Sequence, residues 1–171
     1  MTIRKVREAL LVILAIPVMV LAIPFIVVFL AILPFYIVVM LVWGRWLRHR
    51  YGLKWGQQRR YILFVYSNSP NWKDYIEENW LPRLRPHAVV LNWSERSQWK
   101  QRSPFESKVF WHFAGRKEFN PIAIYLPPRG KIRVVRFWQP FKDFKHGKDR
   151  LLRAAEKELF DAIAEVEDAA A

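Results

Sequence analysis

The chain has 171 residues, of which 53% are hydrophobic, and it carries a formal net charge of +13. This length allows one domain of ordinary size together with an additional segment. The chain contains no cysteine, which excludes a disulfide framework, a thiolate nucleophile and a cysteine-ligated metal site.

An uncharged apolar segment covers residues 9–43, "ALLVILAIPVMVLAIPFIVVFLAILPFYIVVMLVW". It is longer than the roughly 7–15 apolar residues of a secretory signal peptide, so we expect it to be retained. A run of this length without charge is typical of a membrane-embedded segment. The sequence therefore predicts three parts: the basic tip and membrane segment at 1–43, an interfacial linker at 44–60, and a folded domain at 61–171.

Two arrangements of the apolar segment are open. As one helix its 35 residues would extend about 52 Å, against a hydrocarbon core of about 30 Å. Pro17, Pro24 and Pro34 interrupt it, and each removes a helical hydrogen bond. The segment is either a tilted or kinked single span, or a hairpin that turns near Pro24. Basic residues on both flanks favour the hairpin, and both arrangements place the following domain in the cytoplasm.

Tryptophans and arginines alternate directly after this segment. Indole rings prefer the headgroup zone of a membrane, and arginine attracts anionic lipid. The sequence predicts a membrane interface here, with a solvated basic linker as the alternative. We call these residues the collar: Trp43, Arg45, Trp46, Arg48, Arg50 and Trp55.

The remaining chain alternates predicted strands and helices. Residues 61–66 form a continuous apolar run that predicts a covered strand. Ser69 followed by Pro70 indicates a helix start, which Pro82 and Pro86 would end. Residues 87–93 predict a second strand.

The second half is predicted to contain a hairpin and a closing helix. Residues 94–104 look like an exposed loop, and 105–113 fit a short helix. Residues 120–138 predict a β-hairpin around a Pro-Pro-Arg-Gly turn. Asp149 would cap the final helix. The fold class is therefore α/β, with the order β-α-β-α-β-β-α in which the middle helix is the least defined.

This order resembles the thioredoxin fold over residues 61–167. A strand leads through a loop into a helix, and Pro121 stands directly before the hairpin, where that fold keeps its cis-proline. The resemblance implies a groove that binds extended peptide backbone. In this chain the groove would be lined by Ser67, Asn68, Ser69, Pro70, Asn71, Trp72, Asn120 and Pro121. Redox-active thioredoxins carry reactive cysteines in this loop, and their absence here predicts a redox-inactive member.

Catalytic chemistry is not indicated by any complete motif. Ser67 and Ser69 lack a G-x-S-x-G context and a histidine at a recognised spacing. Asp74, Glu77 and Glu78 fall where acids favour a helix N-terminus. No histidine pattern predicts a metal site, and no cofactor is expected.

A mixture of aromatic and basic residues at 93–102 is a candidate binding face. It contains Trp93, Arg96, Trp99, Lys100 and Arg102. Such a mixture suits single-stranded nucleic acid, and equally a membrane surface or a protein partner. Residues 61–171 carry only 19 basic against 14 acidic residues, so most of the basic excess flanks the membrane segment. A protein or membrane partner is therefore favoured over nucleic acid.

The sequence as a whole predicts a membrane-anchored, redox-inactive thioredoxin-like protein with a binding or scaffolding role. Its expected partners are anionic lipid at the collar and a protein at the folded domain. The alternative is a membrane-associated enzyme that acts on a lipid or another membrane-delivered substrate through Ser67, Ser69 or His112. Nucleic-acid binding is the weaker alternative.

Overall fold

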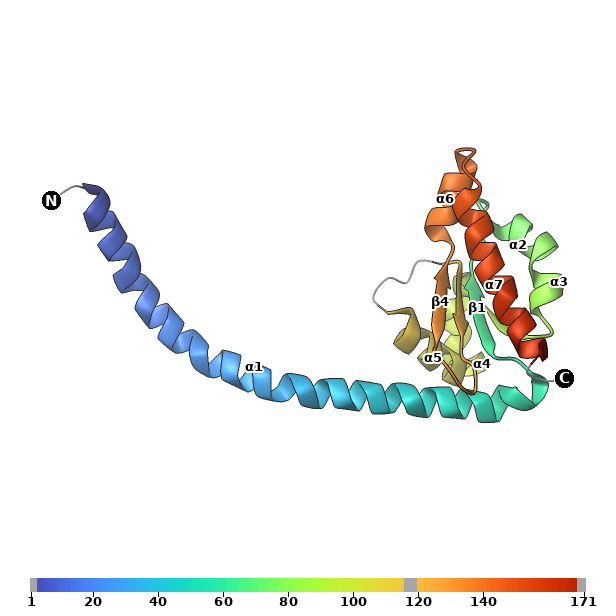
Figure 1. Ribbon diagram of the computed structural model, residues 1–171, viewed down its shortest axis with the longest axis horizontal. Coiled ribbons are helices and arrows are strands. Elements are labelled where there is room, and N and C mark those ends of the chain that lie inside the picture. The colour runs from blue at the N-terminus through green and yellow to red at the C-terminus, as the bar shows by residue number, and fades with distance from the viewer. Residues whose placement is uncertain (1–2, 116–119, 169–171) are drawn as a thin grey trace. The chain divides into compact units, whose positions relative to one another are not determined.

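The computed structural model describes the backbone of residues 3–115 and 120–168 (Figure 1). The chain divides into two compact units, Met1–Trp43 and Gly44–Ala171. The described residues of the first unit belong to helix α1, Ile3–Trp55, and the last turns of that helix belong to the second unit.

Helix α1 continues through the position where the hairpin alternative places a turn. Pro17, Pro24 and Pro34 are all helical. The hairpin expectation is wrong for this structure, because a proline removes only one backbone hydrogen bond and a long helix keeps its ladder on both sides. Within the described residues α1 is one helix long and apolar enough to cross a membrane. Its large apolar side chains from Met19 to Trp43 are exposed, as a lipid-facing segment requires.

The second unit is built on a four-stranded mixed sheet with the strand order β2-β1-β3-β4. The first two strands are parallel, and the other two pairs are antiparallel. The strands are β1 Ile62–Tyr66, β2 Ala88–Asn92, β3 Ile122–Tyr125 and β4 Arg133–Arg136. The predicted apolar strand, second strand and hairpin are thus confirmed. Strand β1 ends at the expected residue, Tyr66, and the other ends lie one or two residues inside the expected limits.

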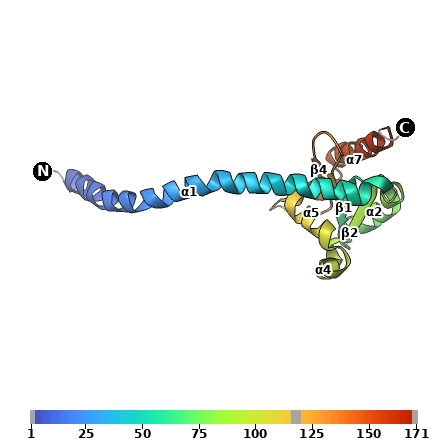
Figure 2. The same ribbon diagram turned by 90° about the horizontal axis from the view of Figure 1, so that it is seen from below.

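Helices cover both faces of this sheet (Figures 1 and 2). They are α2 Lys73–Asn79, α3 Leu81–Leu84, α4 Trp99–Arg102, α5 Pro104–Ala114, α6 Trp138–Lys145 and α7 Arg150–Asp168, together with the short 3-10 turns η1 Gly56–Gln58 and η2 Trp93–Gln98. Both views place α7 and α5 on opposite sides of the strands.

The two sheet faces have separate cores because the side chains of β1 alternate. Phe64 packs with Trp80 and Phe137 under α2, α3, α6 and α7. Leu63 and Val65 point to the other face, where they meet α5 and the last turns of α1. A strand buried on both faces reads as a continuous apolar run, which is the reason for its clear sequence signal.

Several boundaries differ from the sequence expectation. Helix α2 begins at Lys73, because Ser69–Trp72 form a turn in which the Ser69 carbonyl accepts from the Trp72 and Lys73 amides. The predicted loop at 94–104 is largely helical, as η2 and α4. Helix α6 has no counterpart in the expected elements, although its apolar residues Phe137, Phe141 and Phe144 have helical spacing.

Candidate functional site

The loop after β1 and the start of β3 meet at the same end of the sheet, where β1 and β2 finish and β3 begins. We call this the loop edge. In the antiparallel register Val65 lies opposite Ile122, and in the parallel register Tyr66 lies beside Asn92. The residues that follow β1 and β2 therefore lie at the same end of the sheet as Asn120 and Pro121, which precede β3. The candidate groove residues from the two distant parts of the sequence are brought to this same edge.

Side chains at this edge hydrogen-bond mainly to one another. The Asn92 side-chain amide donates to Asn68 Oδ1 at 2.7 Å, and the Asn68 backbone amide donates to Ser94 Oγ at 3.0 Å. The Ser94 amide in turn donates to Asn92 Oδ1 at 2.9 Å. These bonds fix the loop by neutral groups, so they hold a shape and supply neither an acid nor a base.

Neither candidate serine has a histidine as its hydrogen-bond partner. Ser67 Oγ accepts from Trp72 Nε1 at 3.3 Å, and Ser69 Oγ accepts from the Asn71 amide at 3.4 Å. His112 instead packs beside Gly44 and Phe113, and burial lowers its pKa. The arrangement of a nucleophile, a base and an orienting group is not formed by these residues.

The three acidic residues of α2 do not share its first turn, which contains only Asp74, and Glu77 has a partner within the fold. Tyr66 donates to Glu77 at 3.0 Å, and this hydrogen bond is the main cause that lowers the pKa of Glu77. Burial first and the Glu77 contact second raise the pKa of Tyr66 to about 12. In the part of the chain that the structure describes, no group of three or more histidine or acidic side chains is placed to hold a metal ion.

Asn120 is an unusual member of the edge. It is only 8% exposed, and its Oδ1 is buried without a hydrogen-bond partner among the described residues. The peptide bond from Asn120 to the buried Pro121 is cis. A buried acceptor without a donor is rare in proteins, and each instance calls for a structural or functional explanation.

The candidate face at 93–102 needs a correction. Trp99 is only 5% exposed, packs edge-on against Phe110 and donates from Nε1 to the Asn92 carbonyl at 3.1 Å. It is a core residue, because η2 and α4 turn its side chain towards the sheet. Arg96 lies over the half-buried Trp93 ring at 5.2 Å, and exposed Lys100 and Arg102 remain at the surface.

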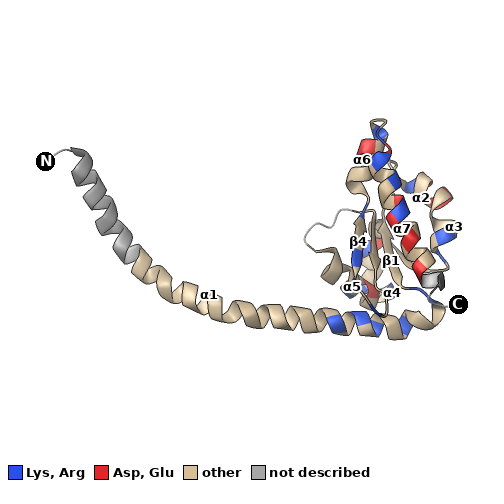
Figure 3. Ribbon diagram, viewed as in Figure 1, with Lys and Arg blue, Asp and Glu red and all other residues tan. Residues whose placement is uncertain are grey.

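The segment 44–60, which contains most of the collar, also differs from the expected linker. Leu47 and Tyr51 are fully buried against the sheet, and Tyr51 donates to the Ile62 carbonyl at 3.0 Å. Their spacing of four residues is a helix-packing signal. The last turns of α1 are therefore a wall of the folded unit, with basic residues along them (Figure 3).

The collar residues have unequal surroundings. Trp43 and Trp46 are exposed, and Arg50 lies 5.8 Å from the Trp46 ring. Trp55 Nε1 donates to the buried Glu106 carboxylate at 2.8 Å, and Lys54 pairs with the same oxygen at 2.6 Å. Through these two contacts Glu106 links α1 to α5.

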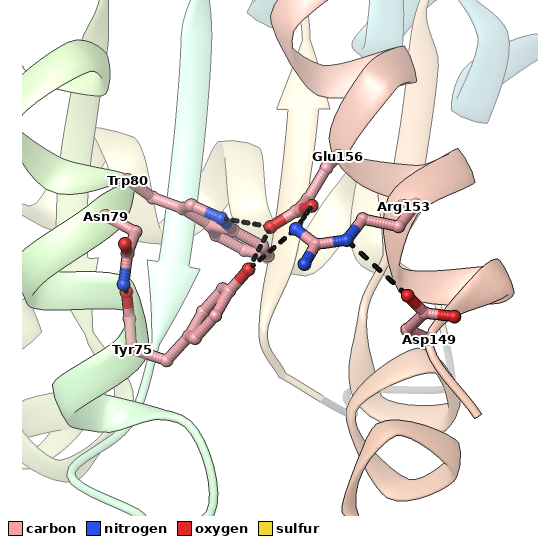
Figure 4. Close-up of polar contacts among 6 residues, drawn as sticks. All are labelled: Tyr75, Asn79, Trp80, Asp149, Arg153 and Glu156. Carbon is pink, nitrogen blue, oxygen red and sulfur yellow. Dashed lines mark hydrogen bonds and ion pairs between the residues drawn. The ribbon is translucent and has the colours of Figure 1, made fainter. Parts of the chain in front are cut away.

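A half-buried carboxylate, that of Glu156, connects α7 to α2 (Figure 4). Glu156 Oε1 accepts from Tyr75 at 2.6 Å and from Trp80 Nε1 at 2.9 Å, while Arg153 binds the other oxygen at 3.0 Å. Burial raises the pKa of Glu156, but these three hydrogen bonds outweigh burial and the net pKa is lowered. Sequence analysis did not find this cluster, because the partners are separated by more than 70 residues.

Two cavities open beside the last turns of α1. The first, of about 390 Å³, is lined by Arg45, Arg48, His49, Gly52, Leu53, Tyr61, Leu126, Pro127 and Pro128. The second, of about 410 Å³, is lined by Arg50, Leu53, Lys54 and Phe105. Sequence analysis identified the arginines but missed His49, Gly52 and Tyr61. A glycine inside a basic helical stretch was the available signal for a cavity.

Comparisons of the chain with protein-family models, curated proteins and solved structures found no match. The established class is accordingly the one that the structure defines: a mixed α/β unit with a four-stranded sheet, preceded by a long apolar helix.

Proposed function

We propose that this chain is a membrane-anchored, non-enzymatic binding protein whose folded unit is a cysteine-free, thioredoxin-like domain. The apolar part of α1 would be the anchor, and the folded unit would lie in the cytoplasm. The basic residues that begin at Arg45, directly after the apolar segment, favour this orientation.

The thioredoxin-like assignment is supported by topology. From Ile62 to Asp168, with consecutive helices counted together, the order is β-α-β-α-β-β-α, with a parallel first strand pair and an antiparallel hairpin. A cis-proline precedes the hairpin, as the resemblance implies. The loop after β1 contains no thiol, so dithiol exchange is excluded and a binding role for the groove is left.

The observation that carries the binding role is the buried Oδ1 of Asn120, which has no hydrogen-bond partner among the residues that the structure describes. It lies next to Pro121, at the edge that also holds the loop after β1. An extended peptide bound at this end of the sheet would donate a backbone N–H to that oxygen once the groups that cover it move aside. A buried acceptor kept without an internal donor costs stability, which is typical of a group reserved for a ligand.

Site-specific photo-crosslinking tests this proposal in native membranes. A photoreactive phenylalanine at the exposed position of Asn71 should give one discrete protein adduct with the full chain. The control carries the same group at exposed Glu158 on α7, where no adduct is expected. Identical adduct patterns at both positions, or none at Asn71, would contradict a binding site at the groove.

An Asn120→Leu variant separates binding from folding. Because Asn120 Oδ1 is buried and unpaired, an apolar replacement of similar volume should raise the free energy of unfolding by about 1 kcal/mol. The same variant should lose most of the Asn71 adduct. A loss of stability in chemical unfolding would show that the amide has a structural partner instead.

A further inference from the structure

The cavity beside Arg45 and Arg48 has the chemistry of an anion site. Arg45, Arg48 and His49 contribute basic side chains, and no acidic side chain of the described residues lines the cavity. Within the described chain neither arginine forms an ion pair with a carboxylate, in contrast to Lys54 on the same helix, which pairs with Glu106. The positive charge of this cavity is therefore not neutralised internally.

Arg48 is held in place by the turn of the β3–β4 hairpin. Its Nε donates to the Pro127 carbonyl at 2.8 Å, which leaves the terminal N–H groups of the guanidinium for another acceptor. A guanidinium fixed in this way loses little side-chain entropy when it binds an anion. Paired N–H donors of arginine match the geometry of phosphate oxygens.

Gly52 forms part of the cavity wall. A Cβ placed on Gly52 would meet no neighbouring side chain or strand within 4 Å, so the space beside this helical position is open. This space belongs to the cavity of about 390 Å³, and a large side chain at position 52 would occupy it.

The position of the cavity along the helix selects the source of the anion. Arg45, Arg48 and His49 follow the last apolar residue, Trp43, by about 3–9 Å at a rise of about 1.5 Å per residue. The headgroup layer on each side of a bilayer is roughly 5–8 Å thick. In the proposed anchoring, with Trp43 at the hydrocarbon boundary, Arg45 and Arg48 would lie within this layer and His49 at its outer limit.

We propose that this cavity binds the phosphate group of one anionic phospholipid, with Arg45 and Arg48 as its ligands. The inference rests on the membrane anchoring in the proposed function, but it concerns a different surface from the peptide groove.

Native mass spectrometry of the full chain in detergent tests the site. The protein is titrated with phosphatidylglycerol and, separately, with phosphatidylcholine, and the retained lipids are counted. The wild type should retain one phosphatidylglycerol in preference to phosphatidylcholine. Arg45→Gln should weaken retention about tenfold or more, since it removes a charge-assisted hydrogen-bonding group.

Two further variants make the test specific. Gly52→Leu fills the cavity without changing the charge and should abolish preferential retention. Arg50→Gln removes one charge from the same helix but outside this cavity, and it should retain the lipid as the wild type does. Equal loss in Arg45→Gln and Arg50→Gln, or normal retention in Gly52→Leu, would overturn the proposal.

A competition experiment distinguishes a membrane lipid from a soluble phosphate ester. Glycerol 3-phosphate at a concentration equal to that of phosphatidylglycerol should not displace the lipid. Displacement at that concentration would overturn the lipid assignment in favour of a soluble ligand. Lipid retention is independent of the Asn71 adduct, so failure of this site and failure of the peptide groove are distinguishable.

Discussion

Two glycines in the last turns of α1 have opposite surroundings. A Cβ on Gly44 would lie 2.6 Å from His112 Nε2, whereas a Cβ on Gly52 would meet nothing within 4 Å. Gly44 thus permits the close approach of α1 and α5, while Gly52 forms part of an open cavity. The same residue type has a packing role at one position and a role in shaping a cavity at the other.

Alanine substitutions should therefore differ in effect. Gly52→Ala should raise the free energy of unfolding by about 1 kcal/mol through helix propensity. Gly44→Ala gains the same propensity but forces His112 to move, so it should leave the chain about 1–2 kcal/mol less stable than Gly52→Ala does. Chemical unfolding followed by tryptophan fluorescence measures both, and equal effects at the two positions would contradict the described packing.

His112 should make stability depend on pH. Burial lowers its pKa in the folded chain below the ordinary value of 6.5. As the pH falls through 6.5, the unfolded state gains a proton that the folded state resists, so stability decreases until the folded pKa is passed. His112→Gln should reduce the difference in unfolding free energy between pH 7.5 and pH 5, and an unchanged difference would exclude this role.

At the scale of elements, the Glu156 cluster joins α7 to α2. Its carboxylate is the acceptor for the indole of the buried Trp80. Glu156→Ala should lower the free energy of unfolding by about 1–3 kcal/mol, because the indole N–H is left without its partner. Glu158→Ala, on an exposed position of the same helix, should change it by less than about 0.5 kcal/mol.

Elements with a local sequence signal could be predicted, and elements that depend on distant partners could not. The apolar run of β1 and the Pro-Pro-Arg-Gly turn of the hairpin are visible within a few residues. Trp99 looked like a surface residue because its neighbours are charged, and only the turns of η2 and α4 bury it. The packing of the last turns of α1 against the sheet was not predicted, although Leu47 and Tyr51 have helical spacing.

Of the candidate site, the position of the groove residues could be predicted from the sequence, but their side-chain surroundings could not. The groove residues follow from chain order, since a loop after a strand and a residue before its antiparallel neighbour meet at one edge. The unpaired oxygen of Asn120 and the cavity at Gly52 depend on which atoms surround them. Side-chain surroundings of this kind arise from residues far apart in the chain, so no local pattern records them.

At the scale of the whole molecule, helix α1 belongs to both units of the chain. The described residues include α1 as a helix able to cross a membrane, and the compact unit starts at Gly44. The last turns of α1, from Gly44 on, therefore belong to the folded unit and form one of its walls.

The absence of cysteine permits the most direct test of membrane anchoring and orientation, because one introduced thiol is a unique reporter. Ser97→Cys, exposed in η2, is treated with a membrane-impermeant maleimide in intact cells and in inverted membrane vesicles. The account predicts labelling in inverted vesicles only. Labelling in intact cells, or recovery of the chain in the soluble fraction, would contradict a membrane-anchored protein with a cytoplasmic binding domain.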